Sequence, residues 1–138
     1  MRSMEKIIIE GRPIAWARAG VSKNRFFDRQ SKERSVFQWK LKSAFRKGPS
    51  EASIALRCIF AFAVPKSLSK VKRKVLLGAP HEGRPDLDNL LKWVGDTGQG
   101  ILWKDDKQVV KLLSVEKIWA EKGSTIIYFE EVDARRTA

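Results

Sequence analysis

The stretch SIALRCIFAFAV, Ser53 to Val64, is rich in Ile, Leu, Phe and Val, with Ala interspersed. A strand with one solvent-exposed face would alternate polar and apolar residues, and this stretch is too uniformly apolar for that pattern. Pro65 ends it. It therefore predicts a central β-strand covered on both faces. Cys58 within it is the only cysteine, so no disulfide can form within the chain, and its apolar neighbours predict a buried, structural thiol.

Apolar periodicity on either side of this strand predicts two helices. From Ser31, apolar residues recur at i, i+4, i+7 and i+8 until Gly48-Pro49, and from Leu87 they recur at i, i+3, i+4 and i+7 until the glycines that begin at Gly95. The remaining segments are predicted as strands over 6–10, 107–120 and 124–132, an irregular basic segment over 12–30 and a short basic helix over 66–74. The expected fold class is α+β: a single domain in which helices pack on a mixed sheet of about four strands.

The bulk composition is that of one globular domain. The chain has 138 residues, of which 43% are hydrophobic and 32% charged. No apolar run approaches the roughly 20 residues needed to span a bilayer, and Ile7-Ile8-Ile9 is too short for a signal-peptide core. We expect a cytoplasmic protein without a membrane partner.

Charge is distributed unevenly along the chain. The formal net charge is +12, which favours a polyanionic partner such as nucleic acid. Residues 1–74 carry 19 Lys and Arg against 5 Asp and Glu, whereas residues 75–138 carry 9 against 11. Six of the sixteen acidic residues fall between Glu82 and Asp106, where they would repel a phosphate backbone unless cations are bound. This conflict is the first indication of a metal site.

The first acidic pair, Asp86 and Asp88, lies where a loop enters the second helix. Residues two apart in a helix point in nearly opposite directions, so the two carboxylates can converge only if Asp86 lies at or before the N-cap. Lys92, four residues after Asp88, then lies on the same helix face. A structural interpretation stays open, in which Asp86 caps the helix and Asp88 forms an ordinary ion pair with Lys92.

A second acidic pair, Asp105-Asp106, precedes the strand predicted over 107–120. Neighbouring strand residues point to opposite faces, so only one of the two can join the first pair. With one His and one Cys in the chain, a zinc site is poorly supported, and any metal must be held by oxygen. Carboxylates suit Mg²⁺, which would reverse the local charge and activate water against a phosphodiester. These residues predict a metal-dependent enzyme that cuts nucleic acid.

The segments Pro85-Asp86-Leu87-Asp88-Asn89-Leu90-Leu91-Lys92 and Trp103-Lys104-Asp105-Asp106-Lys107-Gln108-Val109 resemble the two active-site motifs of the RusA family of Holliday-junction resolvases. The resemblance implies that Asp86, Asp88 and Asp106 bind Mg²⁺, with Mn²⁺ as a substitute, and that Lys92 is catalytic. It favours Asp106 over Asp105. It also implies a homodimer that makes paired nicks across a four-way DNA junction in recombination and repair.

On this basis residues 1–133 are expected to form one nuclease domain and residues 134–138 a loose tail. The main candidates for contacts with DNA phosphates lie in the two basic segments: Arg18, Lys23, Arg25, Lys70, Lys72, Arg73 and Lys74. We interpret Asp96 as structural, with indirect support of the site as the alternative, and His81 as an ordinary surface histidine. Most of the five tryptophans are expected in the core, although one of them could stack on a base.

Two other functions are compatible with the same residues. In a non-catalytic nucleic-acid-binding protein, the acidic residues would be caps and ion pairs and the basic surface would bind the backbone. A nuclease for other branched or flapped DNA would keep the site and change only its specificity.

Overall fold

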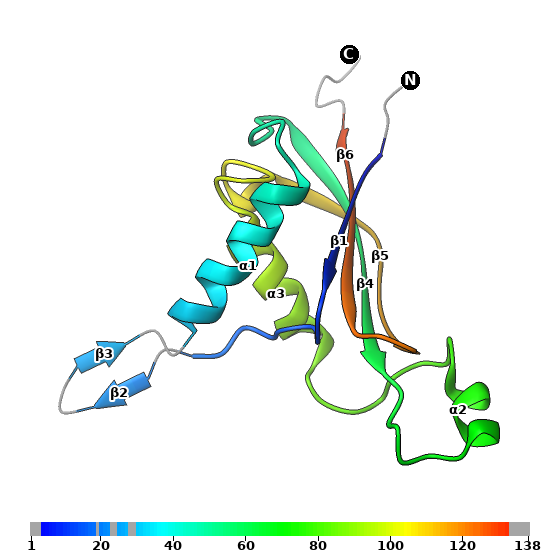
Figure 1. Cartoon of the computed structure of the whole chain (residues 1–138). Coiled ribbons are helices and arrows are strands. Elements are labelled where there is room, and N and C mark those ends of the chain that lie inside the picture. Colours follow the sequence, from blue (N-terminus) through cyan, green and yellow to red (C-terminus); the bar gives the residue numbers. More distant parts are fainter. Residues whose placement is uncertain (1–3, 19, 23–24, 28–29, 133–138) are drawn as a thin grey trace.

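A four-stranded mixed sheet forms the centre of the molecule, with the strand order β1-β6-β4-β5 (Figure 1). The computed structural model describes residues 4–18, 20–22, 25–27 and 30–132. The sheet strands are β1 (Glu5–Glu10), β4 (Ser53–Ala63), β5 (Val109–Ala120) and β6 (Ser124–Val132). The helices are α1 (Ser31–Ala44), α2 (Lys70–Leu76), α3 (Leu87–Gly98) and the 3₁₀ turn η1 (Asp106–Gln108). The predicted α+β class is confirmed.

The connection between β4 and β5 determines how the chain runs. β1 with β6 and β6 with β4 are antiparallel pairs, whereas β4 and β5 are parallel. Two parallel strands cannot be joined by a tight hairpin, so the chain must cross back over the sheet. α2 and α3 lie in this crossover, and η1 follows directly before β5. The first acidic motif therefore lies within this crossover, where α3 begins, and the second lies at its end, directly before β5.

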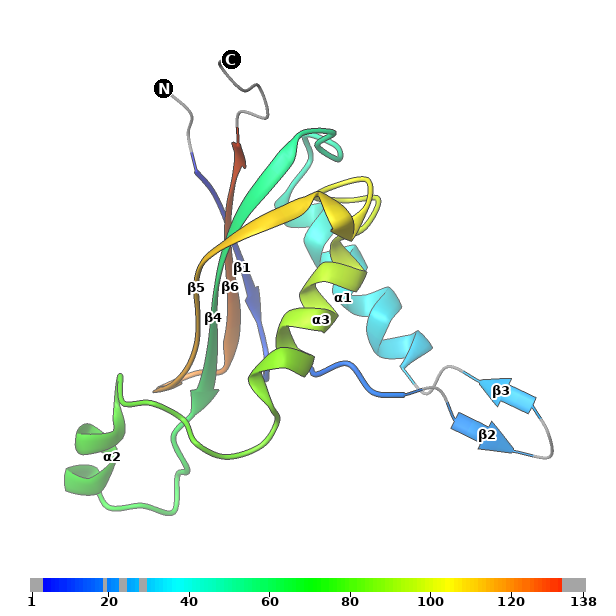
Figure 2. The ribbon, with the colours of Figure 1, turned by 180° about the vertical axis from the view of Figure 1, so that it is seen from behind.

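The core lies between one face of the sheet and the pair α1 and α3 (Figures 1 and 2). Alternate residues of β4, from Ile54 to Phe62, are buried on this face, as the apolar run predicts. The prediction that β4 is covered on both faces is wrong, because both long helices lie on one side. On the other side Ala55 is buried because it is small and lies between the longer residues Lys111 and Glu130 of the neighbouring strands.

Two local predictions need correction. The segment predicted as irregular contains a hairpin of β2 (Gly20–Ser22) and β3 (Arg25–Phe27). The basic helix begins only at Lys70, because the Ser69 hydroxyl caps it by accepting a hydrogen bond of 3.2 Å from the Lys72 backbone N–H. The predicted tail, 134–138, lies outside the described residues. Within the part of the chain described, no helix is long and apolar enough to cross a membrane.

Cys58 and His81 are both buried in the structure. The burial of the Cys58 side chain in β4 confirms the expected buried position, and this burial raises the pKa of the thiol to about 12. The surface position expected for His81 is wrong. Its ring stacks on Phe62 with centroids 4.2 Å apart and lies 4.3 Å from the Trp119 ring, because its loop folds back along β5 through a hydrogen bond from the His81 backbone N–H to the Lys117 carbonyl.

His81 should make stability depend on pH. Burial, and then the nearby positive charge of Lys117, lowers the pKa of His81 below its ordinary 6.5. The unfolded chain therefore binds the proton first, and the free energy of unfolding should fall as the pH drops below about 6.5. His81→Phe removes this proton and keeps an aromatic ring. In urea denaturation at pH 7.5 and 5.5, we expect a smaller acid loss of stability for the variant than for the wild type. Equal losses would show that His81 does not contribute.

Two glycines of α3 should respond to alanine in opposite directions. A Cβ on Gly98 would lie 2.7 Å from the Trp103 ring, which is fully buried and cannot move aside. We expect Gly98→Ala to lower the free energy of unfolding by about 1–3 kcal/mol. A Cβ on Gly95 meets only ordinary contacts, so Gly95→Ala should raise stability by about 0.5–1 kcal/mol through helix propensity. Thermal melts of both variants check the two signs, and shifts in the same direction would contradict this packing.

Candidate active site

One face of α3 organises the predicted site residues. Asp88, Lys92, Gly95 and Gln99 follow one another at i, i+4, i+7 and i+11, which places them on a single line along the helix. Asp106 approaches this line from η1. Its Cβ lies 3.7 Å from the position that a Cβ on Gly95 would occupy, and its backbone N–H donates to the Gln99 side-chain oxygen at 3.1 Å. Lys92 therefore lies along this face between Asp88 and the position where Asp106 approaches.

Asp86 is the N-cap residue of α3, with an extended backbone at φ −69° and ψ 144°. This position, predicted from the helix geometry, is confirmed. Its side chain makes no capping hydrogen bond. The structural interpretation, in which the Asp86 carboxylate caps α3, is therefore not supported. The loop before it is held by Lys117 of β5, whose ammonium donates to the Gly83 and Pro85 carbonyls at 2.6 and 2.8 Å. Asp86 thus has a fixed backbone and a side chain without a structural partner in the described part of the molecule.

Asp88 and Lys92 do not pair with each other. Among the described residues, no salt bridge joins Lys92 to a carboxylate, and the Asp88 side chain accepts one hydrogen bond, from the neighbouring Asn89 N–H at 2.9 Å. The Lys92 ammonium instead lies 3.5 Å from the centre of the Trp16 ring. Trp16 is itself fixed, because its backbone N–H donates to the Asn89 carbonyl at 2.9 Å. The ring therefore binds the ammonium and leaves Asp88 unpaired.

Asp105 and Asp106 differ in the contacts that their carboxylates make. Asp105 is the N-cap of η1: its carboxylate accepts from the Lys107 N–H at 2.9 Å, and its own N–H donates to the Gln108 side chain at 2.8 Å. The two residues are not in a strand, so the predicted alternation of faces is not what separates them. The capping turn occupies Asp105, whereas the Asp106 carboxylate has no hydrogen-bond or ion-pair partner among the described residues.

The carboxylates of Asp86, Asp88 and Asp106 do not lie close enough together to form a preformed metal site in the described part of the chain. Within the described ranges, no three His, Cys, Asp or Glu side chains are placed so that they could hold one metal ion together. From Asp88 to Gly95, beside which Asp106 lies, the helix rises by about 10 Å. Asp88 thus lies at one end of the α3 face, two residues after Asp86 at the N-cap, and Asp106 lies further along the face.

Asp96 joins the two long helices. It forms a salt bridge with Arg34 of α1, whose guanidinium also lies 5.3 Å from the centre of the Trp93 ring. This contact supports the structural interpretation of Asp96. Trp93 and Trp103 are core residues as expected, whereas Trp39 is 68% exposed on α1.

The predicted DNA contacts are only partly described by the structure. Arg18, Lys70, Lys72 and Lys74 are exposed, Arg73 is half-buried, Arg25 lies in β3, and Lys23 falls outside the described residues. α2, which carries four of these side chains, buries none of its residues and lies well away from α1 (Figure 1). Their contact with DNA stays a prediction.

Two residues of the candidate site, Trp16 and Lys117, could not be found from the sequence. Neither the aromatic ring of the one nor the charge of the other reveals a contact with a distant segment.

The two neighbouring acids should separate in stability measurements. Asp105→Ala removes the cap of η1 and should lower the free energy of unfolding by about 0.5–2 kcal/mol. Asp106→Asn removes a charge that has no structural partner in the described part of the chain, so it should change stability by less than about 0.5 kcal/mol. Urea denaturation of both variants measures the difference. A large loss in Asp106→Asn would assign this residue a structural role instead.

Comparison with known proteins identifies the family. None of the curated proteins compared with the chain matches it. The family model described as "Endodeoxyribonuclease RusA" matches residues 10–130, which include both acidic motifs, β4, β5 and all of β6 but its last two residues, whereas Glu10 alone of β1 falls inside the match. With most of its length matched, the chain belongs to the RusA family of endodeoxyribonucleases.

Proposed function

We propose that this endodeoxyribonuclease resolves Holliday junctions by paired, Mg²⁺-dependent nicks in DNA recombination and repair. The observation that carries the proposal is that Asp86 at the N-cap of α3, Asp88 on its face and Asp106 beside it have no ion-pair partner among the described residues. Unpaired carboxylates in a chain of net charge +12 are costly to place next to DNA unless they serve its chemistry. Family membership disfavours the alternative of a protein that only binds nucleic acid.

The donor set fits Mg²⁺ in kind. All three side chains offer carboxylate oxygens, which are the ligands that Mg²⁺ prefers, and this ion usually takes only one or two carboxylates and keeps several waters. Asp86, Asp88 and Asp106 would be its ligands, and the three carboxylates must move closer together than they lie here for one ion to contact them all. Mn²⁺ would substitute for Mg²⁺. When bound, the ion supplies an activated water and offsets charge on the phosphate oxygens.

The remaining groups of the site have roles that follow from their contacts. Lys92 carries an ammonium that is not paired with Asp88, and it can offset negative charge that develops on the phosphate or the leaving oxygen. Trp16 keeps that ammonium beside the helix face, and Lys117 fixes the loop that presents Asp86. These contacts pre-position the groups before DNA binds.

Resolution of a four-way junction needs two cuts in strands of like polarity, and the described part of one chain carries one such site. We therefore propose a homodimer as the active form, with branched DNA as its partner and the cytoplasm as its place of action. The exposed basic side chains of the N-terminal half would hold the junction arms through phosphate contacts that weaken with salt. A nuclease for flapped or other branched DNA is the second candidate, because the site itself does not distinguish these substrates.

Cleavage of synthetic DNA tests the proposal. With Mg²⁺, the wild-type chain should make paired nicks in a four-way junction and cut linear duplex far more slowly. Asp88→Asn should bind the junction and cut it at least about a hundredfold more slowly. Glu82→Gln is a matched control, since it neutralises an exposed acid in the preceding loop that has no assigned role. An intact junction with folded, dimeric wild-type protein would refute the assignment, and equal cutting of flaps and junctions would favour the second candidate.

A further inference from the structure

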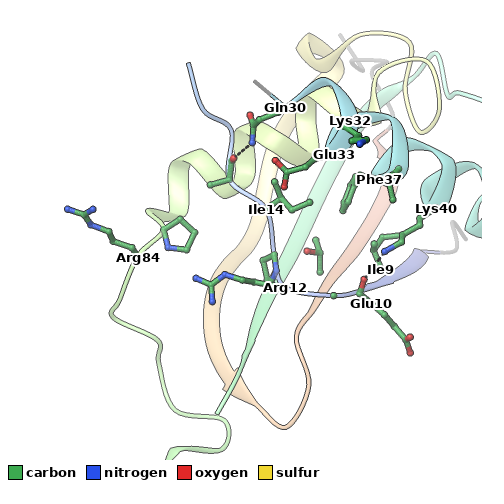
Figure 3. Close-up of a pocket in the computed structure, with 16 residues that line it drawn as sticks. Ile9, Glu10, Arg12, Ile14, Gln30, Lys32, Glu33, Phe37, Lys40 and Arg84 are labelled. Atoms are coloured by element: carbon green, nitrogen blue, oxygen red, sulfur yellow. Dashed lines mark hydrogen bonds between the residues drawn. The ribbon is translucent and has the colours of Figure 1, made fainter. Parts of the chain in front are cut away.

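A groove of about 760 Å³ lies between α1 and the segment that follows β1 (Figure 3). Its apolar lining includes Ile9, Ile14 and Phe37. Arg84 and Pro85 line its far side, and they directly precede Asp86. An extended ligand that lies in the groove would therefore reach the candidate active site at that end.

The rim of the groove is basic. Lys32 and Lys40 extend from α1, and Arg12 and Arg84 come from the loops opposite (Figure 3). Among the described residues, none of these four side chains forms a salt bridge. The Lys40 ammonium donates to the Glu10 backbone carbonyl at 3.4 Å, and the Arg12 guanidinium lies 5.3 Å from the centre of the Phe62 ring. This positive charge is therefore available to an anionic ligand.

Exposed apolar side chains adjoin the same groove. Val36, which lines it, is 52% exposed, and Trp39, which is outside the lining but three residues further along α1 and so next to Val36 on the helix surface, is 68% exposed. Within the described ranges, no ring contact or cation occupies the Trp39 face. Exposed aromatic surface beside unpaired positive charge is suited to a ligand that has both phosphates and accessible flat rings.

We propose that this groove binds a short unpaired stretch of DNA at the branch point, with its phosphates along the four basic side chains and a base stacked on Trp39. A duplex hides the faces of its bases, so it would use the basic rim but gain nothing from the exposed ring. Glu10 and Glu33 also line the groove and would repel phosphates. They confine the phosphates to the rims and can accept hydrogen bonds from base amino groups.

The groove assignment rests on the proposed function, because the unpaired strand would be the substrate strand of the resolvase and would run from the groove to Asp86.

The affinity of the protein for single-stranded DNA tests the groove assignment independently of cleavage. The protein used is the full chain with Asp88→Asn, in the absence of divalent metal. The probe is a fluorescently labelled single strand of about 12 nucleotides, compared with a duplex of the same sequence by fluorescence anisotropy.

Charge reversal on the groove rim is compared with the same reversal elsewhere on α1 and just after it. Lys32→Glu with Lys40→Glu alters the groove, whereas Lys42→Glu with Arg46→Glu alters exposed residues outside its lining by the same formal charge. We expect the first pair to weaken single-strand binding at least tenfold and the second less than threefold. The slope of log affinity against log salt should shrink by about 1.4 in the first pair only. Equal losses in the two pairs would overturn the groove assignment.

Substitutions of Trp39 test the base contact. Trp39→Ala should weaken single-strand binding at least fivefold and leave duplex binding unchanged, and Trp39→Phe should restore most of the affinity. Unchanged binding in Trp39→Ala would overturn the assignment to an unpaired strand. Junction cleavage by the wild type is scored separately: if it succeeds while both groove tests fail, only the inference falls. If cleavage fails while the groove tests succeed, the proposed function falls and the binding site stands.

Discussion

Because β5 pairs with β4 in parallel, the chain has to cross the whole length of the sheet between the two strands, and α3 is the segment that makes this crossing. The beginning of α3 carries Asp86 and Asp88, and the turn that follows the helix carries Asp106. β5 then returns past the loop before α3 and fixes it through Lys117. The parallel pairing of β5 with β4 thus determines where the acidic residues of the candidate site can lie.

Electrostatics explains why these acids are tolerated. Most charged groups of a folded chain either pair or face water, and Asp96 and Asp105 follow this rule through Arg34 and the η1 cap. The helix face made by Asp88, Lys92 and Gly95 departs from it, since its cation is bound to an aromatic ring and its carboxylate is unpaired in the described part of the chain. Local departures of this kind are expected where binding or catalysis, and not folding, decides which residues are present.

Much of the fold could be predicted from the sequence, because long apolar periodic runs determine helices and strands. The β4 run, the α3 face and the N-cap position of Asp86 all follow from local spacing. What could not be predicted depends on contacts between distant segments. The Trp16 ring under Lys92, the burial of His81 beneath Phe62 and the separate tasks of Asp105 and Asp106 require the path of the chain, which residue spacing does not contain. The open second face of the sheet could not be predicted, because a buried alanine in the sequence does not reveal whether a helix or longer neighbouring side chains cover it.

The contact between Lys92 and Trp16 has a consequence for the biosynthesis of the protein. The site draws on the N-terminal segment for its ring, on α3 for its acids and ammonium, and on β5 for the lysine that fixes the loop. These parts come together only after most of the chain has left the ribosome and the sheet has closed. A nascent, truncated or partly unfolded copy therefore lacks the contacts that hold Lys92 and the loop before Asp86 in place.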